Sequence, residues 1–404
     1  MSHLDGEVSF PKGTHAREGI GRLPLWVGLC AVGGAGVLLG PPVRDLWLGF
    51  GFRWAYILTG SALLSFGLTP VVIRLAFRLG VLDYPDARKV HASPTPLLGG
   101  LAVYLACGMS ILANSIFDAQ LTAIVGGASL LVLVGILDDV RGVSAKARLL
   151  AQLTAVGAVI GSGVMITLFP RSPAGMLGNV LLTVVWLLGI TNAMNFFDGM
   201  DGLAAGLSVV TAVFLAVVAV QTYQPFLGWV AAAVVGSCVG FLPYNFRPRR
   251  PAAIFLGDAG STFLGFTLAA LAVKGEWAEN SIVDIAAPVL IFWIFIFDMT
   301  YITAARIVTG RVRSFHDWIA YVGRDHLHHR LATLLGSTRK SVLLIFLLSS
   351  VMGLAAVALR NARPLDAVVL VLQAAVIAVI FSILEHVAQG KQGPGAGAGD
   401  QGSG

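Results

Sequence analysis

The sequence alternates between long apolar runs and short polar segments along most of its length. A helix that crosses the hydrocarbon of a bilayer needs about 20 mostly apolar residues, and runs of about this length recur here. They lie near 24–43, 54–73, 97–116, 119–137, 149–169, 178–197, 202–222, 225–244, 259–273, 285–305, 341–359 and 367–384. The pattern predicts an all-α, polytopic membrane protein with about 11–12 transmembrane helices. The predicted number of spans is eleven or twelve, because 259–273 is short and only a brief turn separates 202–222 from 225–244.

The composition also indicates a chain that resides in lipid rather than in water. Of the 404 residues, 56% are hydrophobic and only 12% are charged, and the mean hydropathy is +0.83. Ordinary soluble domains contain roughly 25% charged residues. Cys30, Cys107 and Cys238 each lie alone within an apolar run, so the sequence indicates neither a disulfide framework nor a zinc ribbon.

The positions of Lys and Arg predict the orientation, because cytoplasmic loops are enriched in positive charge. If the N-terminus is cytoplasmic and about twelve spans alternate, most of the 27 Lys and Arg residues lie in cytoplasmic segments. The exceptions are Arg44, Arg53, Arg171, Lys274, Arg360 and Arg363. We therefore expect both termini in the cytoplasm. The net charge of +6 then suits anionic headgroups or an anionic substrate, and nucleic acid is not expected as a partner.

The same pattern divides the chain into four segments. Residues 1–23 are a polar cytoplasmic segment, and 24–53 are an extra N-terminal span with an external loop. Residues 54–387 are the main membrane domain, and 388–404 are a disordered, glycine-rich tail. Because no cleavable-signal pattern is evident, the first span is expected to stay as an anchor.

Polar motifs gather in five loops that this topology brings to the cytoplasmic face. They are RKVHASPTPLLGG (88–100), DDVRGVSAKARLL (138–150), NAMNFFDGMDG (192–202), YNFRPRRPAAIFLGDAGST (244–262) and RDHLHHRL (324–331). Chance would scatter acids, amides, cations and histidines over both faces. The sequence therefore predicts one site at the cytoplasmic ends of the spans.

The stretch NAMNFFDGMDGLAAG places amides and acids at regular intervals. Asn192, Asn195, Asp198 and Asp201 recur every third residue, so at a helical end they stay on one broad face, drifting about 60° per step. They are expected to converge on one ligand, and the glycines between them let the backbone approach it. A polar helix cap needs only one Asx residue and one glycine, so four residues in register favour a binding site.

The acids of two other loops have the chemistry of a metal and phosphate site. Asp258, in GDAGS (257–261), offers a hard carboxylate oxygen to Mg²⁺ beside the free N–H groups of a helix start. The alternative is an ordinary turn. Asp138 and Asp139 point about 100° apart on a helix, so one acid can serve the site while the other caps a helix or pairs with a cation.

The histidines of the last polar loop indicate contacts with phosphate or sugar oxygens. His326, His328 and His329 lack a cysteine partner, which makes zinc the weaker interpretation. Beside Arg330 they are better understood as hydrogen-bond donors, with a solvated juxtamembrane loop as the alternative. Asp298 is the one acid well inside an apolar run, and an acid in that position is costly unless it faces protein or water. It is therefore expected to be functional.

These motifs together resemble one family. RKxH…GG, DD, NxxNxxDGxDGLAxG, GDxGSxxLGF and HxHHRL occur in the order found in the polyprenyl-phosphate N-acetylhexosamine-1-phosphate transferases. This glycosyltransferase family 4-like group includes the WecA, TagO and MraY types and the eukaryotic dolichyl-phosphate GlcNAc-1-phosphate transferase. The resemblance covers about residues 55–385. It implies about eleven spans with a cytoplasmic active site, and an extra span at 24–43.

The resemblance implies transfer of a sugar-1-phosphate from a UDP-sugar to a lipid phosphate, giving lipid-diphosphate-sugar and UMP. The implied cofactor is Mg²⁺, with Mn²⁺ as an alternative. The implied partners are a UDP-N-acetylhexosamine, undecaprenyl phosphate and membrane lipids, and a homodimer is left open. The implied location is the bacterial inner membrane.

The resemblance also implies roles for individual residues, carried over motif by motif. The catalytic set is Asp138, Asp139, Asp198 and His326, and the metal ligands are Asp258 and Asn195. The nucleotide and sugar would contact Asn192, Asp201, Asn245, Phe255, His328, His329 and Arg330, with Phe255 stacking on uracil. The lipid phosphate would contact Lys89 and Arg148.

Two segments depart from the family pattern. Where most members have Lys in a KLL segment, this chain has Arg148, with Lys146 two residues earlier, and either cation is able to bind the lipid phosphate. The loop before HLHHRL is also longer. Its apolar residues in 314–323 fall at helical spacing, which predicts an interfacial amphipathic helix that roofs the site, with a simple linker as the alternative.

The mechanism expected is direct attack in one step, because a phosphate monoester with a second pKa of about 6 is mostly dianionic at pH 7. A general base or an Asp nucleophile is the alternative. His326-Leu327-His328-His329 has the WecA-type form, whereas MraY types carry three consecutive histidines. The expected donor is thus a UDP-N-acetylhexosamine such as UDP-GlcNAc, for a surface polysaccharide. The competing functions are transfer of phospho-MurNAc-pentapeptide, a membrane transporter, and a non-catalytic binder of lipid headgroups.

Overall fold

The computed structural model describes residues 25–85, 93–247, 249–278, 280–310, 312, 325–359 and 362–391. This part of the chain is almost entirely helical, as the sequence predicts. The first helices are α1 (Leu25–Leu39), α2 (Pro41–Gly49), α3 (Arg53–Leu79), α4 (Gly99–Ala113), α5 (Ala119–Arg141), α6 (Ala145–Gly161), α7 (Pro173–Phe197) and α8 (Leu203–Gln221). They are followed by α9 (Pro225–Asn245), α10 (Gly257–Lys274), α11 (Ser281–Ile291), α12 (Trp293–Val308), α14 (Leu327–Leu335), α15 (Thr338–Ala358) and α16 (Pro364–Lys391).

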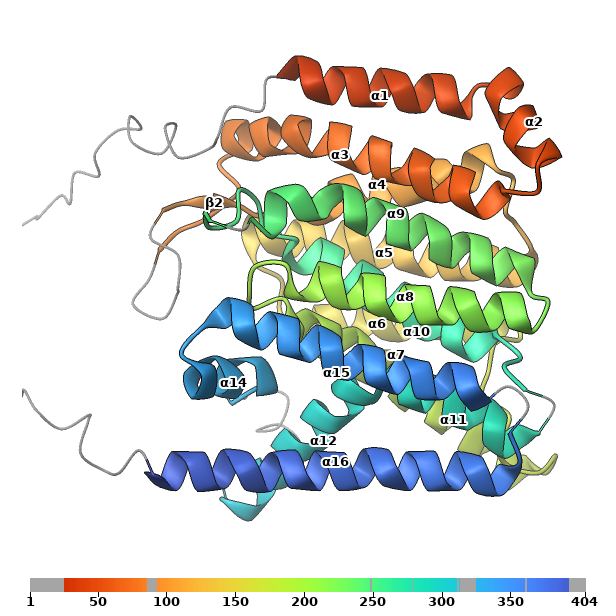
Figure 1. Ribbon diagram of the computed structural model, residues 1–404, viewed down its shortest axis with the longest axis vertical. Coiled ribbons are helices and arrows are strands. Elements are labelled where there is room, and N and C mark those ends of the chain that lie inside the picture. Colours follow the sequence, from red (N-terminus) through yellow and green to blue (C-terminus); the bar gives the residue numbers. More distant parts are fainter. Residues whose placement is uncertain are drawn as a thin grey trace, which may run out of the picture.

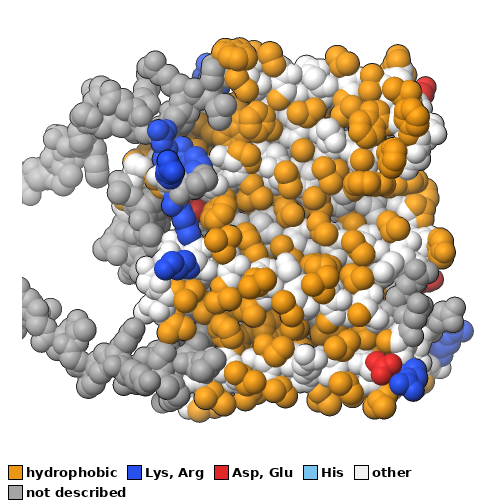
Figure 2. Space-filling model, viewed as in Figure 1, with side chains coloured by type: hydrophobic (Ala, Val, Ile, Leu, Met, Phe, Trp, Pro, Cys, Tyr) orange, Lys and Arg blue, Asp and Glu red, His pale blue; other side chains and the backbone are white. Residues whose placement is uncertain are grey.

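The long helices lie side by side, and their ends collect at two opposite edges of the molecule (Figure 1). α10 lies inside the bundle, where it contacts α4, α5, α7, α8 and α9 and is buried along nearly its whole length. Hydrophobic side chains cover most of the face seen in Figure 2, whereas Lys and Arg gather mainly at one edge of it. Leucines in the middle of the outer helices, such as Leu133, Leu181 and Leu347, are exposed. Such an apolar belt faces lipid, so the chain is a polytopic membrane protein.

Each predicted apolar run corresponds to a helix of the structure or, at 285–305, to a bent pair of helices. In the described part of the chain, seven helices are long and apolar enough to cross a membrane, or nine if each of two bent pairs is one span. The other predicted runs form α4, α6 and α10, which have 15, 17 and 18 residues. Because α10 is enclosed by protein and begins with a polar motif, it does not need a full lipid-facing apolar length. These three helices together with the nine account for the twelve apolar runs found in the sequence.

The predicted span near 285–305 is a bent pair of helices. α11 and α12 meet at Phe292 with an angle of 77° between them. Pro288 lies in the last turns of α11, and a proline removes a backbone donor and favours a kink. After the bend, α12 runs obliquely across the bundle, and Asp298 in its middle contacts the first residues of α14. The bend therefore brings a buried acid of the membrane domain to the histidine motif.

Glycines let α10 lie against its neighbours at backbone distance. A Cβ atom on Gly135 of α5 would lie only 2.6 Å from the backbone nitrogen of Ala259. At Gly257 the backbone has φ +74°, and a Cβ there would lie 2.7 Å from a carboxylate oxygen of Asp139. Both positions require the smallest residue. The close approach places the acidic end of α5 on the first turn of α10.

A short ribbon was not predicted from the sequence. β1 (Leu82–Asp83) pairs with β2 (Thr95–Pro96) in antiparallel register. The segment before α10 joins this ribbon, because Phe255 N–H donates to the carbonyl oxygen of Pro96 at 2.8 Å and Gly99 N–H donates to that of Phe255 at 3.0 Å. Two-residue strands leave too short a pattern to be read in advance. The RKxH residues between the strands, Lys89 included, and the predicted helix at 314–323 lie outside the described residues.

The described polar motifs lie at one edge of the bundle, as expected. α5, α7 and α9 end there, and α6, α8, α10 and α14 begin there (Figure 1). α1 begins and α16 ends at the same edge, which agrees with the expectation that both ends of the membrane domain lie on one side. That this side is the cytoplasm stays a prediction.

The orientation is testable with single cysteines at the two edges. Arg339 is exposed at the edge with the polar motifs, and Tyr223 is 85% exposed in the turn between α8 and α9 at the other edge. The two test variants are Arg339→Cys and Tyr223→Cys. In right-side-out membrane vesicles, a membrane-impermeant maleimide is expected to label Tyr223→Cys and to leave Arg339→Cys unlabelled until detergent is added. The unsubstituted chain is the control for its own cysteines. The opposite labelling would contradict the predicted orientation.

Candidate active site

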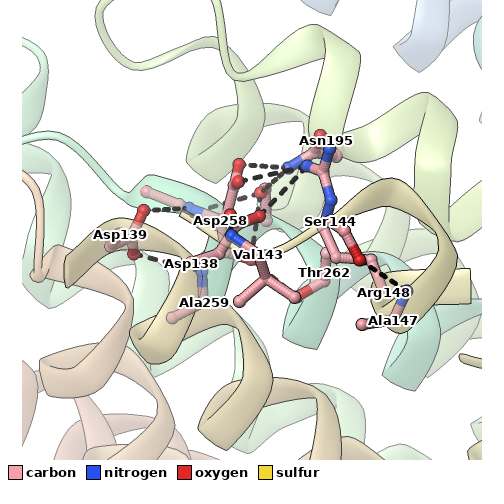
Figure 3. A network of polar contacts seen from close by, with 12 residues as sticks. Asp138, Asp139, Val143, Ser144, Ala147, Arg148, Asn195, Asp258, Ala259 and Thr262 are labelled. Carbon is pink, nitrogen blue, oxygen red and sulfur yellow. Dashed lines mark hydrogen bonds and ion pairs between the residues drawn. The ribbon is translucent and has the colours of Figure 1, made fainter. Parts of the chain in front are cut away.

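Four helices meet at the first turn of α10 and bring acidic, amide and basic side chains together (Figure 3). α10 contributes Asp258 as its second residue. α5 contributes Asp138 and Asp139 from its last turn, α6 contributes Arg148 from its first turn, and α7 contributes Asn195 from its last turn. Segments that are far apart in the sequence thus form one polar cluster, as the motifs predict.

Asp258 is at the centre of this cluster. Its Oδ1 accepts a hydrogen bond from Nδ2 of Asn195 at 2.7 Å, and its Oδ2 lies 3.6 Å from Nη1 of Arg148. The same arginine nitrogen lies 3.1 Å from Oδ2 of Asp138. The Asp258 side chain is 36% exposed, against 9% for Asp138. Asp258 is therefore the more accessible of the two carboxylates that share Arg148.

The adjacent acids at the end of α5 have different partners. Asp139 accepts hydrogen bonds from the backbone N–H groups of Asp258, at 3.1 Å, and of Ala259, at 3.4 Å. It therefore caps α10, where a negative charge also complements the helix dipole. Asp138 accepts from the backbone N–H of Val143 at 2.6 Å and faces Arg148. Asp139 thus caps a helix, as one acid of the pair was expected to do, and the catalytic role predicted for these acids stays a prediction.

Asp198 follows the last residue of α7 and belongs to the same electrostatic group. Burial and the neighbouring carboxylates of Asp258 and Asp139 raise the pKa of Asp198 well above its usual range, and a backbone hydrogen bond from Gly257 opposes this only in part. The carboxyl groups of Asp138, Asp139, Asp198 and Asp258 therefore lie close together, and Arg148 pairs with two of them. Such a cluster attracts a further cation.

The regular Asn and Asp motif does not converge on one point. Asn195 and Asp198 face the acids, but the first and last members of the motif have structural partners. Asn192 forms a reciprocal amide pair with Gln152 of α6, with distances of 3.1 and 3.2 Å. Asp201 accepts from the backbone N–H of Ala252 at 2.8 Å. α7 ends at Phe197, so the helical spacing that underlies the prediction does not continue to Asp201.

Asn245 links two loops of the site. Its Oδ1 accepts from the backbone N–H of Gly202 at 2.9 Å, and its Nδ2 donates to the carbonyl oxygen of Ile254 at 2.9 Å. Because Asn245 is buried, this amide fixes the DGxDG turn to the segment that leads into α10. Phe255 in that segment is half-buried, and its backbone is hydrogen-bonded to Pro96 and Gly99. The nucleotide contacts predicted for Asn245 and Phe255 stay predictions.

The histidine segment is held by α12. Oδ2 of the fully buried Asp298 lies 2.7 Å from Nδ1 of His326, and its Oδ1 accepts from the backbone N–H of Leu327 at 2.7 Å. Arg306, further along α12, makes a bidentate ion pair with Asp325 at 2.7 and 2.8 Å. The buried acid singled out in the sequence therefore has a structural partner in a predicted catalytic residue.

The remaining residues of this segment surround His328. Its side chain is fully buried, and neither ring nitrogen has a hydrogen-bond partner among the described residues. Burial, with His329, His326 and Arg330 nearby, lowers the pKa of His328 well below its usual value, so the ring is neutral at pH 7. The His329 ring centroid is 4.2 Å away, and Arg330 lies over the Tyr301 ring at 4.0 Å. A neutral, buried ring with unused nitrogens is suited to hydrogen bonding rather than to ion pairing.

The end of α7 joins the acidic cluster to the histidine segment. Asn195 donates to Asp258, the next residue, Phe196, stacks on His326 with centroids 4.8 Å apart, and Phe197 lies 5.4 Å from the His328 ring. Three successive side chains thus contact two groups that lie far later in the sequence, one in α10 and one in the histidine segment. The acidic cluster and the histidine segment are therefore neighbours in the structure.

Sequence reasoning missed several residues that build the site. Gln152 pairs with Asn192, Arg306 holds Asp325, and Tyr301 lies under Arg330. Two of these residues have a feature in the sequence that could have identified them. Gln152 is a polar residue within an apolar run, and Arg306 follows Asp298 by roughly two helical turns, which places both on one face of α12. Lys89, predicted to contact the lipid phosphate, lies outside the described residues.

Comparison with known proteins agrees with these motifs. The family model described as Glycosyl transferase family 4 matches residues 121–276, which include the acidic cluster. A probable undecaprenyl-phosphate N-acetylglucosaminyl 1-phosphate transferase of Bacillus subtilis (strain 168) is 36% identical over 302 residues, covering 73% of this chain and 82% of the relative.

Two further relatives extend the comparison. A decaprenyl-phosphate N-acetylglucosaminephosphotransferase of Mycolicibacterium smegmatis is 29% identical over 393 residues, covering 89% of this chain and 92% of the relative. A phospho-N-acetylmuramoyl-pentapeptide-transferase of Caldicellulosiruptor bescii is 32% identical over 237 residues, covering 53% and 72%. The chain therefore belongs to glycosyl transferase family 4 and is a homologue of the polyprenyl-phosphate N-acetylglucosamine-1-phosphate transferases.

Proposed function

We propose that this protein transfers N-acetylglucosamine-1-phosphate from UDP-GlcNAc to undecaprenyl phosphate or a related polyprenyl phosphate in a bacterial inner membrane. The products are polyprenyl-diphosphate-GlcNAc and UMP, and the lipid-linked sugar would initiate a cell-surface glycan. The observation that carries this proposal is the contact of Arg148 with both Asp138 and Asp258 at one edge of a membrane bundle. A cation held between two acids there suits a reaction between a membrane-bound phosphate and a soluble diphosphate.

The reaction forms one bond and breaks one. An oxygen of the lipid phosphate attacks the sugar-bearing phosphorus of the UDP-sugar, and the bond from that phosphorus to the bridging oxygen breaks. UMP leaves with the electron pair. Both reactants are anionic, so the site must neutralise charge and align the two phosphates, as in other phosphoryl transfers. We favour direct attack in one step, since the lipid phosphate is mostly dianionic at pH 7.

The acidic cluster fits a magnesium ion. Among the described residues, no three His, Cys, Asp or Glu side chains are placed to form a complete protein cage. Mg²⁺ usually binds through one or two carboxylates and completes its shell with water and substrate phosphates. The partly exposed Asp258 beside Asp138 provides that donor set. When bound, the metal would neutralise the diphosphate and polarise its phosphoryl oxygens.

Asn195 has a more specific role in this proposal than was predicted. Its amide nitrogen, not its oxygen, faces Asp258 and also donates to Oγ of Ser261 at 2.9 Å. Asn195 therefore orients the carboxylate that would hold the metal. Its own Oδ1 is available as a further hard oxygen ligand.

The histidine segment would bind the sugar-phosphate end of the donor. The neutral ring of His328, the adjacent His329 and the guanidinium of Arg330 supply hydrogen bonds and one positive charge next to the end of α7. His326 stacks on Phe196, the residue that follows Asn195, which supports its place among the catalytic residues.

Transfer of phospho-N-acetylmuramoyl-pentapeptide is the second candidate. It is favoured by the identity of 32% to the relative of that name, although this relative matches only 53% of the chain. The sequence His326-Leu327-His328-His329 favours the GlcNAc-type reaction. The two candidates share the acidic cluster and differ in the donor.

Asp258→Asn is expected to lower turnover by at least about 100-fold, because the amide cannot supply the charge that holds Mg²⁺ against the diphosphate. UMP release by purified protein with UDP-GlcNAc and undecaprenyl phosphate measures this. Asp45→Asn, an exposed acid near the opposite edge, is the matched control and is expected to stay at wild-type activity. Full activity of Asp258→Asn at limiting Mg²⁺ would remove Asp258 from the metal site.

Arg148→Ala is expected to lose about 100-fold in kcat/KM and to raise the KM for the lipid phosphate, because it leaves two acids without their shared cation. Arg148→Lys keeps the charge without the planar fork, so a loss of only about tenfold is expected. Lys146→Ala on the same helix is the control, since Lys146 is exposed and the Arg148 contacts stay intact. If Lys146→Ala, and not Arg148→Ala, weakens lipid binding, the assignment is wrong.

The donor is testable with a panel. UMP release is expected to be fastest with UDP-GlcNAc, slower with its C4 epimer and with a 6-deoxy analogue, and lowest with UDP-MurNAc-pentapeptide. A single hydrogen bond to a sugar hydroxyl accounts for differences of this kind. Preference for the pentapeptide donor would support the second candidate. No UMP release from any donor would exclude the transferase activity itself.

A further inference from the structure

A buried carboxylate of α12 contacts the histidine segment at three points. Asp298 has no exposed surface, and it lies outside the five motifs. Its Oδ2 lies 2.7 Å from Nδ1 of His326, its Oδ1 accepts from the N–H of Leu327 at 2.7 Å, and Nη2 of Arg330 lies 3.9 Å from the same Oδ1. One acid within the membrane domain therefore organises the first turn of α14.

The spacing of the histidine motif explains these contacts. His326 and Arg330 are four positions apart, so they lie on one face at the start of a helix. The free N–H of Leu327 points the same way, because the first N–H groups of a helix have no intrahelical acceptor. Asp298 thus caps α14 from outside its own segment, and no side chain of the segment itself makes a cap hydrogen bond there.

The orientation of the His326 ring is fixed at its Nδ1 side and on its face. A carboxylate accepts hydrogen bonds and does not donate them, so Nδ1 must carry the proton in the pair with Asp298. Phe196 stacks on the ring at 4.8 Å with an angle of 27° between the planes. Only Nε2 is then available for other partners, and it carries no proton unless the ring is charged.

We propose that Asp298 is a positioning residue of the transfer reaction, which keeps the proton on Nδ1 of His326 and presents Nε2 to the donor substrate. This inference rests on the proposed function of the site. Asp298 itself does not touch the reacting atoms and acts through His326. Arg306, two turns further along α12, supports the same segment by its ion pair with Asp325 and so fixes where the segment meets α12.

Asp298→Asn separates the capping contact from the tautomer. The amide oxygen is still able to accept from the N–H of Leu327, so α14 is expected to stay in place and the melting temperature to change little. The amide nitrogen can only donate, so it forces Nδ1 of His326 to lose its proton and Nε2 to gain one. The same exchange in a carboxylate–histidine pair of serine proteases lowers kcat by about 10⁴. Here we expect kcat to fall at least about 100-fold with KM changed by less than about threefold.

A double-variant cycle tests whether Asp298 acts through His326. If it does, adding Asp298→Asn to His326→Gln lowers kcat no further, whereas independent roles give multiplied losses. Asp325→Asn is the matched control within the same segment. It breaks the ion pair with Arg306, so it is expected to lower the melting temperature more and kcat less than Asp298→Asn. Multiplied losses, or a wild-type kcat in Asp298→Asn, would overturn the proposal.

A readout that does not depend on turnover separates this inference from the proposed function. In ¹⁵N-histidine-labelled protein, the imidazole ¹⁵N shifts report which nitrogen is protonated, and His326→Gln identifies the signal. We expect a protonated Nδ1 in the unsubstituted chain and a protonated Nε2 in Asp298→Asn. An unchanged tautomer would overturn the positioning role even if the transferase is active. An inactive enzyme with the expected tautomers would overturn the proposed function alone.

Discussion

The contact between the end of α5 and the first turn of α10 is the constraint on which the site depends. Gly135 has no side chain, so the backbone of α5 reaches the nitrogen of Ala259, and Asp139 then reaches the free N–H groups of α10. The helix start is satisfied by a carboxylate from a neighbouring helix rather than by its own segment. Once this register is set, Asp138, Asp258 and Arg148 have little freedom, and the cluster follows from backbone packing.

The bilayer explains why so much chemistry lies at one edge. Charged and amide groups are costly in hydrocarbon unless they are paired or face water. Two acids of the described residues show how such groups are satisfied by partners. Asp139 accepts two backbone N–H groups and Asp298 meets His326 and Leu327. These pairs keep individual residues in place, whereas the apolar belt keeps the whole bundle in lipid.

The sequence was sufficient to predict the helices and the gathering of the described polar motifs at one edge, since apolar runs and motif spacing are local signals. It was insufficient where the outcome depends on packing. Nothing local distinguishes Asn192, which pairs with Gln152, from Asn195, which contacts Asp258, because the distinction depends on where α6 and α10 lie. The bend at Phe292 likewise depends on the helices around it. Asp298 is unusual in the sequence, but its partner depends on how α14 lies beside α12.

The junction at the end of α7 has a consequence for how this protein varies through evolution. Asn195, Phe196 and Phe197 contact separate partners, so each position has its own fixed direction. Inserting or deleting one residue in this turn rotates the helical side chains that follow it by about 100° and uncouples the acids from the histidines. Loops at the opposite edge have contacts of their own, such as Gln224 with Glu276, but they do not join the acids to the histidines. Length variation among homologues should therefore accumulate at that edge and be purged from the last turn of α7.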